Sequence, residues 1–386
     1  MKVLVKWSSY DNMFLQRNLP YLIPLVLGTE LEHIQKSILN KHLSGDGLYS
    51  NKCARLLEKM TGSKMVVMTT SCTDALEMTA ILANIEPGDE VIMSSFNFVS
   101  AANAFVLRGA SIKFVDIDPD TMNIDANKIE QAITEKTKVI LAMHYGGVAC
   151  DMTKIMSLAN QYNLLVVEDA AHCLDAYHES THLGSIGHLG VFSFHETKNI
   201  QCGEGGALLI NDAQYMERAN ILKDKGTNRA LFQQGIVQKY TWVDVGSSYT
   251  LGELNAAFLY AQLLSVKEVS FKRKKIWNEY YNLFSKTDIE CMINENSNAH
   301  IYYIKLKNND ARKKVVSYLK ENQISAVSHY EPLHSSLAGK KYSSFVGQDN
   351  FTTSESQRLL RLPIYFDMNE DDVVHIFSTV CRAYGM

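Results

Sequence analysis

Short apolar runs alternate with amphipathic stretches along residues 60–210 of the chain. The apolar runs predict β-strands at 64–68, 90–94, 111–117, 138–144, 164–169, 190–194 and 206–210. Helical spacing separates most of them, as in DMTKIMSLANQYN over residues 151–163. Wholly apolar strands that alternate with helices are typical of a mostly parallel sheet with both faces covered. The pattern therefore predicts an α/β fold.

Two features interrupt this alternation. The runs at 190–194 and 206–210 have no helical stretch between them, so we expect a long loop in place of the usual crossover. Residues 254–284 predict one long helix or two joined helices, and a smaller α+β unit follows them. We therefore expect a large domain over residues 28–258 and a small C-terminal domain over 259–386. Ligands of such sheets bind at the carboxyl ends of the strands, which we expect to face the small domain.

Composition and charge argue against several classes of protein. The 386 residues carry a net charge of −4 without a block of Lys and Arg, which argues against nucleic acid or an anionic membrane as the main partner. The seven cysteines include no C-x-x-C pair and are odd in number, so neither a disulfide framework nor a zinc site is expected. Residues 1–14 lack the features of a signal peptide, and the apolar stretch 21–27 is too short to span a bilayer. We expect a cytoplasmic protein.

Two candidate binding groups follow predicted strands. The stretch TTSCTDA (69–75) is a hydroxyl-rich turn that opens a helix, where free N–H groups and the helix dipole suit a phosphate. The alternative is that Ser71 simply caps the helix. Phe98 lies just beyond the strand 90–94 and is placed to stack on a planar ring, although a buried core phenylalanine is the commoner case.

Two ionisable residues complete the set. Asp169 ends an apolar strand, and one acid of the pair Glu168–Asp169 must point into the protein or its cleft. A buried carboxylate needs a partner, for which a protonated pyridine nitrogen, an ion pair or a helix end would serve. Lys198 is either a solvated loop charge or a desolvated amine that forms a Schiff base. A pyridoxal-type cofactor needs such a lysine, an acid at its ring nitrogen, a phosphate cup and usually a stacking ring, and all four types occur here.

Several longer motifs resemble the DegT/StrS-type sugar aminotransferases. They are SCTDALEM, PGDEVIM, NFVSAANAFVLRGA, VVEDAAH, SFHETKN, GEGGALLIND, KGTNR, YTWVDVGSSY and HYEPLH, spread from about residue 28 to the C-terminus. The resemblance implies a fold type I pyridoxal 5′-phosphate transferase, with a mostly parallel large domain and a smaller α+β C-terminal domain, that works as a homodimer with a shared active site. The usual N-terminal segment of the family is replaced by an atypical extension over residues 1–27.

The resemblance also implies roles for individual residues. Lys198 would carry the cofactor, and Asp169 would pair with its pyridinium nitrogen. Phe98 would stack on the ring, and His172 would lie beside its 3-hydroxyl. The residues implied at the cofactor phosphate are Cys72, Thr73, Ser193 and, from the partner subunit, Asn228. The residues implied in the sugar-nucleotide pocket are His329, Tyr330 and His334. No metal is expected, because His144, His172 and His195 lack a ligand motif.

The activity implied is transfer of the amino group of L-glutamate to the C4 keto group of dTDP-4-oxo-6-deoxy-D-glucose, for surface polysaccharide synthesis. Amination at C3, or of another nucleotide-linked keto-sugar, is the alternative within the family. A pyridoxal-dependent sugar dehydratase is disfavoured because those relatives carry histidine in place of Lys198. A nicotinamide-dependent oxidoreductase fits poorly, since Gly184, Gly187 and Gly190 precede a strand instead of following one. A catalytically silent sensor on the same fold is disfavoured by the presence of both Lys198 and Asp169.

The predicted helix over 266–284 carries several basic residues that we expect to form a solvated face, namely Lys267, Lys272, Arg273, Lys274 and Lys275.

Overall fold

The structure is a computed structural model that describes residues 18–293 and 297–385. The expectation about a signal peptide therefore lies outside the described residues, as does most of the atypical extension over residues 1–27. None of the described helices combines the length and the apolar character needed to cross a membrane.

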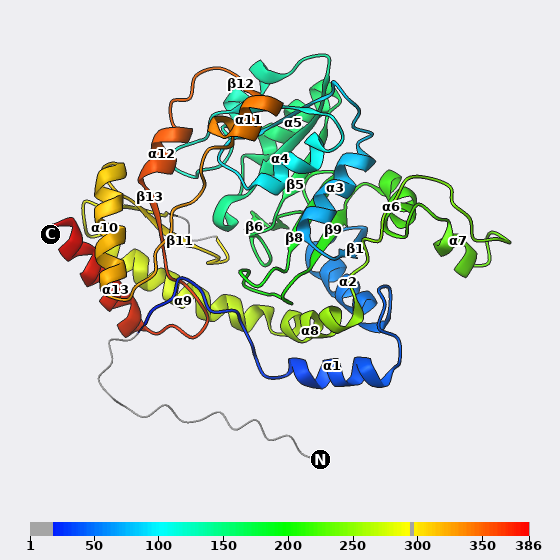
Figure 1. Ribbon diagram of the computed structural model, residues 1–386, viewed down its shortest axis with the longest axis horizontal. Coiled ribbons are helices and arrows are strands. Elements are labelled where there is room, and N and C mark those ends of the chain that lie inside the picture. Colours follow the sequence, from blue (N-terminus) through cyan, green and yellow to red (C-terminus); the bar gives the residue numbers. More distant parts are fainter. Residues whose placement is uncertain (1–17, 294–296, 386) are drawn as a thin grey trace.

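A sheet that counts eight strands over the described residues forms the centre of the molecule (Figure 1). In spatial order they are β1 (Met65–Thr69), β9 (Gly206–Ile210), β8 (Leu189–Ser193), β5 (Leu165–Asp169), β4 (Thr137–Met143), β2 (Glu90–Ser94), β3 (Ser111–Val115) and β12 (Ser343–Phe345). Neighbours from β8 to β12 are parallel, whereas β9 runs antiparallel to both β1 and β8. This confirms the mostly parallel sheet and the loop that replaces a crossover between β8 and β9.

Helices cover both faces of this sheet. They are α2 (Leu48–Thr61), α3 (Cys72–Leu82), α4 (Val99–Val106), α5 (Met152–Tyr162), α6 (Met216–Lys223) and α8 (Glu253–Leu264). Two further helices lie outside this layer: α1 (Glu30–Leu39) packs on α8, and α7 (Arg229–Gln233) follows α6 and projects from the side of the molecule (Figure 1). Alternate strand residues enter different cores, because side chains of a strand point to opposite faces. Val67 packs in the core that contains α3 and α4, whereas Val66 and Met68 pack against α2 and α8.

Local sequence explains where the helices next to the site begin. Ser71 is the N-cap of α3 and accepts a hydrogen bond from the Asp74 N–H, so the capping interpretation of this serine is confirmed. Asp151 caps α5 in the same way, and Asn163 ends that helix in the left-handed conformation. Each of these helices follows a strand, which places its first turn near the carboxyl edge of the sheet.

The C-terminal part of the chain adds a second sheet. The helix predicted over residues 254–284 is two joined helices, α8 and α9 (Val266–Phe284), with Ser265 between them. The second sheet joins β10 (Glu290–Cys291), β11 (Tyr302–Lys305) and β13 (Leu359–Leu362), and it lies beside α10 (Asn309–Glu321) and α13 (Glu370–Tyr384) at the C-terminal end of the molecule (Figure 1). Two short helices, α11 (Leu337–Tyr342) and α12 (Thr352–Arg358), flank β12, while β6 (Tyr177–His178) and β7 (Thr181–His182) form a small hairpin.

The division into domains at residues 258 and 259 stays a prediction. It falls within α8, and β12 from the C-terminal part pairs with β3 of the central sheet.

The solvated face expected over residues 266–284 needs one correction. Arg273 is buried, and its guanidinium donates to the carbonyl oxygens of Ala299, His300 and Ile364. Lysines surround this arginine in the sequence, which suggested an exposed position. The carbonyl groups that accept its hydrogen bonds come from segments distant in the sequence.

Candidate active site

A cavity of about 430 Å³ lies where the central sheet meets the C-terminal part. Nine of the eleven predicted site residues line it: Cys72, Thr73, Phe98, Asp169, His172, Ser193, Lys198, His329 and Tyr330. They come from the ends of β5 and β8, the first turn of α3, the N-cap of α4 and the loops beyond. Residues far apart in the sequence meet here because parallel strands present their carboxyl ends at one edge.

Lys198 lies in the loop between β8 and β9. Its N–H donates to the carbonyl of His195, and the loop is closed by bonds from Glu196 N–H to the Gly203 carbonyl and from Cys202 N–H to the Phe194 carbonyl. Burial lowers the pKa of Lys198 to about 8, although the nearby carboxylate of Asp169 opposes this shift. A substantial fraction of this amine is therefore neutral near pH 8 and available as a nucleophile or base.

Asp169 points into the same cavity from the end of β5. It is buried, and its Oδ1 accepts a hydrogen bond from the Ala171 N–H at 3.1 Å. Burial raises the pKa of Asp169, while that hydrogen bond and the charge of Lys198 oppose the shift. No hydrogen bond from a described residue reaches Oδ2. The arrangement suits a protonated ring nitrogen as the missing donor.

The turn before α3 forms a cup beside these residues. The first N–H groups of a helix have no partner within the helix, so those of Cys72 and Thr73 remain available to an anion. Gly206 of β9 passes so close that a Cβ on it would lie 2.4 Å from the Ser71 carbonyl and the Cys72 nitrogen. Ser193, at the end of β8, lines the same cavity. The phosphate-binding roles of Cys72, Thr73 and Ser193 stay predictions, but the donor set fits a phosphate.

A further donor supports a ligand in this cavity. Asn97 lines it, and its buried Nδ2 has no hydrogen-bond partner in the described part of the chain. Phe98, the next residue, is 56% exposed and tilts toward Tyr330 at a centroid distance of 6.2 Å. Its ring is accessible, as a stacking role requires, although that role stays a prediction.

Three histidines form one wall of the cavity. The ring centroids of His172 and His300 lie 4.4 Å apart, and His329 lies near His172. Burial lowers the pKa of His172 and His300 well below the usual value, and the neighbouring positive charges lower both further. The Gly146 N–H donates to Nδ1 of His172, so this ring carries its proton on Nε2. The wall is therefore neutral and offers hydrogen bonds without adding charge.

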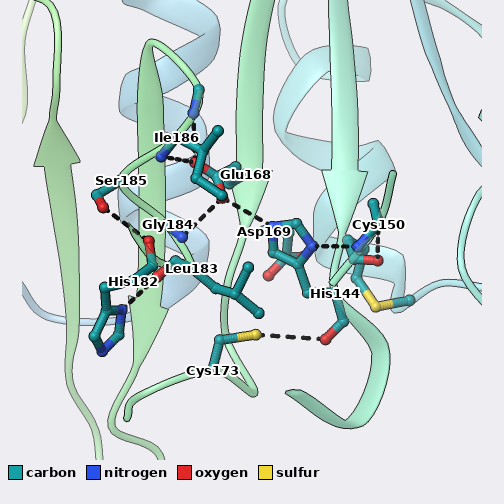
Figure 2. A network of polar contacts seen from close by, with 12 residues as sticks. His144, Cys150, Glu168, Asp169, Cys173, His182, Leu183, Gly184, Ser185 and Ile186 are labelled. Atoms are coloured by element: carbon teal, nitrogen blue, oxygen red, sulfur yellow. Dashed lines mark hydrogen bonds and ion pairs between the residues drawn. The ribbon is translucent and has the colours of Figure 1, made fainter. Parts of the chain in front are cut away.

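The residue before Asp169 faces away from the cavity into a polar network (Figure 2). Both oxygens of Glu168 accept hydrogen bonds, one from the N–H groups of Ile186 and Gly187 and the other from the Gly184 N–H and His144 Nε2. Burial raises the pKa of Glu168, but the bond from His144 and the backbone N–H groups outweigh burial and lower it. Two of the three glycines considered for a nicotinamide site, Gly184 and Gly187, thus bind a carboxylate of the protein itself.

Two predicted residues do not line the cavity. Asn228 is buried, and its Oδ1 accepts a hydrogen bond from the Thr241 N–H. His334 contacts Ser95 through Nδ1 at 2.7 Å and pairs with Asp349 through Nε2 at 3.3 Å. The roles expected for Asn228 and His334 stay predictions.

The cavity lining also includes residues that sequence reasoning missed, among them Tyr21, Asn97, His300 and Arg361. A sequence signal existed for Arg361, which interrupts the apolar run LLRL of β13. A charged residue inside a buried strand needs a polar or charged partner, so such a residue is a candidate for a binding site. Tyr21 belongs to a stretch whose apolar pattern gave no sign of a site.

The chain matches the DegT/DnrJ/EryC1/StrS aminotransferase family over residues 27–381. It belongs to this family.

Several relatives support the assignment. The spore coat polysaccharide biosynthesis protein SpsC of Bacillus subtilis is 31% identical over 378 residues, which cover 94% of this chain and 96% of that protein. The aminotransferase TlmJ from Streptoalloteichus hindustanus matches the fold with a TM-score of 0.88 at 24% identity, covering 96% of this chain and 99% of its own. The putative sugar aminotransferase Spr1654 from Streptococcus pneumoniae, in its PMP-form, gives 0.86 at 25% identity, covering 95% and 99%.

These findings confirm a fold type I aminotransferase whose cofactor is pyridoxal 5′-phosphate.

Proposed function

We propose that the protein transfers the amino group of L-glutamate to the C4 keto group of dTDP-4-oxo-6-deoxy-D-glucose. The products are 2-oxoglutarate and dTDP-4-amino-4,6-dideoxy-D-galactose, which would feed a surface polysaccharide such as enterobacterial common antigen or O-antigen. The observation that carries the proposal is the convergence of Lys198, Asp169 and the first turn of α3 on one cavity. A relative named for spore coat polysaccharide biosynthesis supports the sugar class of the acceptor.

The bound cofactor would supply an electron sink, and the protein residues would direct its use. Lys198 would carry the cofactor and, once freed, move a proton at the donor's Cα, because an amine with a pKa of about 8 both accepts and returns a proton near neutral pH. Asp169 would keep a proton on the ring nitrogen, and Nε2–H of His172 would donate to the ring's hydroxyl oxygen. Cys72, Thr73 and Ser193 would hold the phosphate.

We also propose that two copies share their active sites. The segment after Asn228 exposes large apolar side chains, with Trp242 78% exposed and Ile236 65% exposed. In α1, Leu31 and Leu39 are exposed to a similar extent, at 76% and 71%. Exposed apolar side chains of this size suit a surface that a partner covers, and a second copy would bring Asn228 toward the cofactor phosphate.

The sugar side of the site would involve His329, Tyr330 and, from its neighbouring loop, His334. Tyr21 lines the cavity and adds a contact from the segment just before the matched family region. The alternative proposal is amination at C3, or of another nucleotide-linked keto-sugar, because pocket shape decides the position of attack. The cytoplasm as its compartment remains a prediction from cysteine usage.

The test follows the visible absorption of the purified holoenzyme. L-Glutamate should bleach the yellow band, and dTDP-4-oxo-6-deoxy-D-glucose should then restore it. Lys198→Ala is the control and should do neither. Bleaching without recovery would keep the aminotransferase and reject this sugar, so that 3-oxo sugars become the next acceptors to try. Undiminished turnover in Lys198→Ala would reject the role of the lysine.

A further inference from the structure

Arg361 lies in the cavity as a buried cation with no carboxylate partner among the described residues. It lies on β13 and is only 5% exposed, yet it lines the cavity beside Lys198. Its Nη1 contacts the ring nitrogens of His329 at 3.1 and 3.3 Å. Its Nε is buried and has no hydrogen-bond partner within residues 18–293 and 297–385. Part of this guanidinium's donor fork is therefore unused.

The groups around Arg361 do not neutralise its charge. His329 is neutral, because burial and the charges of Arg361 and Lys198 lower its pKa to about 2. The ring of Tyr21 faces the guanidinium at 5.1 Å, which stabilises a cation but leaves its charge in place. Among the ion pairs of the described residues, none involves Arg361. A buried guanidinium is costly unless an anion pairs with it, so the site is prepared for an anionic ligand.

The position of Arg361 indicates which anion it meets. The α-carboxylate of an amino acid is separated from the reacting nitrogen by Cα alone, so it must lie close to Lys198. The phosphates of a nucleotide sugar are attached at the far side of the sugar ring from C4, and the first turn of α3 offers its own donors to the cofactor phosphate. A planar guanidinium matches a carboxylate with two parallel hydrogen bonds.

We propose that Arg361 binds the α-carboxylate of the amino-acid donor and of the 2-oxo acid it becomes. The inference rests on the proposed function, since it assigns a residue to the donor half of that reaction. Tyr21 lies against the guanidinium and limits the directions in which its fork can point. A segment from the beginning of the described chain thereby takes part in donor recognition.

The experiment compares Arg361→Gln and Arg361→Lys with wild type and with Arg382→Gln. Arg382 is exposed in the last turn of α13 and does not line the cavity. Affinity is measured by titrating each holoenzyme with α-methyl-L-glutamate, which has no α-proton to lose, and following the spectral shift. Discrimination is measured as the rate of bleaching with L-glutamate divided by the rate with its α-amide, isoglutamine, or with its γ-amide, glutamine.

We expect Arg361→Gln to bind α-methyl-L-glutamate at least about 30-fold more weakly than wild type, because removing one partner of a buried charge pair has an effect of this size. Its preference for L-glutamate over isoglutamine should largely disappear, while its preference over glutamine persists. Arg361→Lys should fall between, and Arg382→Gln should match wild type. Binding of dTDP, measured by calorimetry, should change less than about threefold.

Three results would overturn the inference. One is loss of dTDP binding with donor affinity intact, which would assign Arg361 to a phosphate. Another is loss of discrimination against glutamine alone, which would assign it to the γ-carboxylate. The third is a wild-type enzyme that uses isoglutamine as well as L-glutamate, a result that needs no variant to fold. Failure of L-glutamate to bleach wild type at all would instead reject the donor in the proposed function.

Discussion

Replacing Glu168 by glutamine tests whether the network behind Asp169 holds the site in place. The side chain of Glu168 is fully buried, and its two oxygens accept four hydrogen bonds (Figure 2). Glutamine has the same shape, but one oxygen becomes an amide NH₂ that can only donate. In one orientation the amide faces the N–H of Gly184 and Nε2–H of His144, and in the other it faces the N–H groups of the Ile186–Gly187 pair.

His144 cannot relieve the mismatch by moving its proton. Its Nδ1 accepts a hydrogen bond from the Cys150 N–H at 3.1 Å, so the proton belongs on Nε2. Either orientation of the glutamine therefore leaves two buried donors without acceptors. Each such donor costs about 1–3 kcal/mol, so Glu168→Gln should lower the free energy of unfolding by about 2–6 kcal/mol.

The measurement is urea unfolding of apoenzyme at one fixed protein concentration, with linear extrapolation to water. The pH dependence gives a second check. The folded-state pKa of Glu168 is lowered, so its contribution is fully present above the unfolded pKa of about 4.3 and is lost as pH falls through the folded pKa. The part of the difference that comes from the charge of Glu168 should therefore shrink in strong acid.

Glu217→Gln is the control, because Glu217 is exposed on α6 and the same atoms change there. It should alter the free energy of unfolding by less than about 0.5 kcal/mol. If Glu168→Gln proved as stable as this control at pH 7, the four hydrogen bonds would not be the support that the geometry indicates.

Three further predictions concern the cavity itself. In the apoenzyme, Lys198→Met should raise the free energy of unfolding above that of wild type, and this difference should fall by about 3 kcal/mol between pH 8 and 10.5. The reason is that burial lowers the folded pKa of Lys198 from 10.5 to about 8, so the cost of burying the charged amine disappears over that range. A difference independent of pH would contradict this. Asp169→Asn should retain the cofactor but lose at least about 100-fold in turnover, measured as bleaching by L-glutamate, because its amide cannot stabilise a protonated ring nitrogen; normal bleaching would argue against the pairing. Gly206→Ala should lower the free energy of unfolding by about 1–3 kcal/mol and weaken cofactor binding, measured by equilibrium dialysis, because the new Cβ would lie 2.4 Å from backbone atoms. In the control Gly252→Ala the nearest atom is 3.8 Å from the new Cβ, so cofactor affinity should match wild type.

The central sheet could be predicted because its strands carry a local signal. Each of the seven predicted runs corresponds to a strand, with ends that differ by at most two residues. The positions of Lys198 and Asp169 follow from that pattern, since residues just after parallel strands meet at one edge. Strand β12 could not be found in this way. It has three residues, and its pairing with β3 joins segments more than 200 residues apart.

The residues that sequence reasoning missed or misjudged owe their positions to packing between distant parts of the chain. Arg273 and the half-buried Lys274 are neighbours in sequence, but only Arg273 donates to carbonyl groups from the C-terminal part. Tyr21 enters the cavity because Leu19 pairs with the segment at Ile324, a contact that no local pattern encodes. Local periodicity thus specifies which face of an element is buried, while the partners of a buried polar group depend on the assembled fold.

The neutral histidine wall and the isolated arginine have a common consequence for Lys198. The charge of Arg361 lowers the pKa of Lys198, whereas the carboxylate of Asp169 raises it. Protonated rings at His172 and His329 would add two more positive charges near the lysine and lower its pKa further. Because these histidines are neutral, the pKa of the Lys198 amine stays at about 8, where the amine can accept a proton and return it. A donor carboxylate bound at Arg361 would remove one of the remaining lowering influences, so donor binding itself would make Lys198 a stronger base at the moment when a proton must be taken.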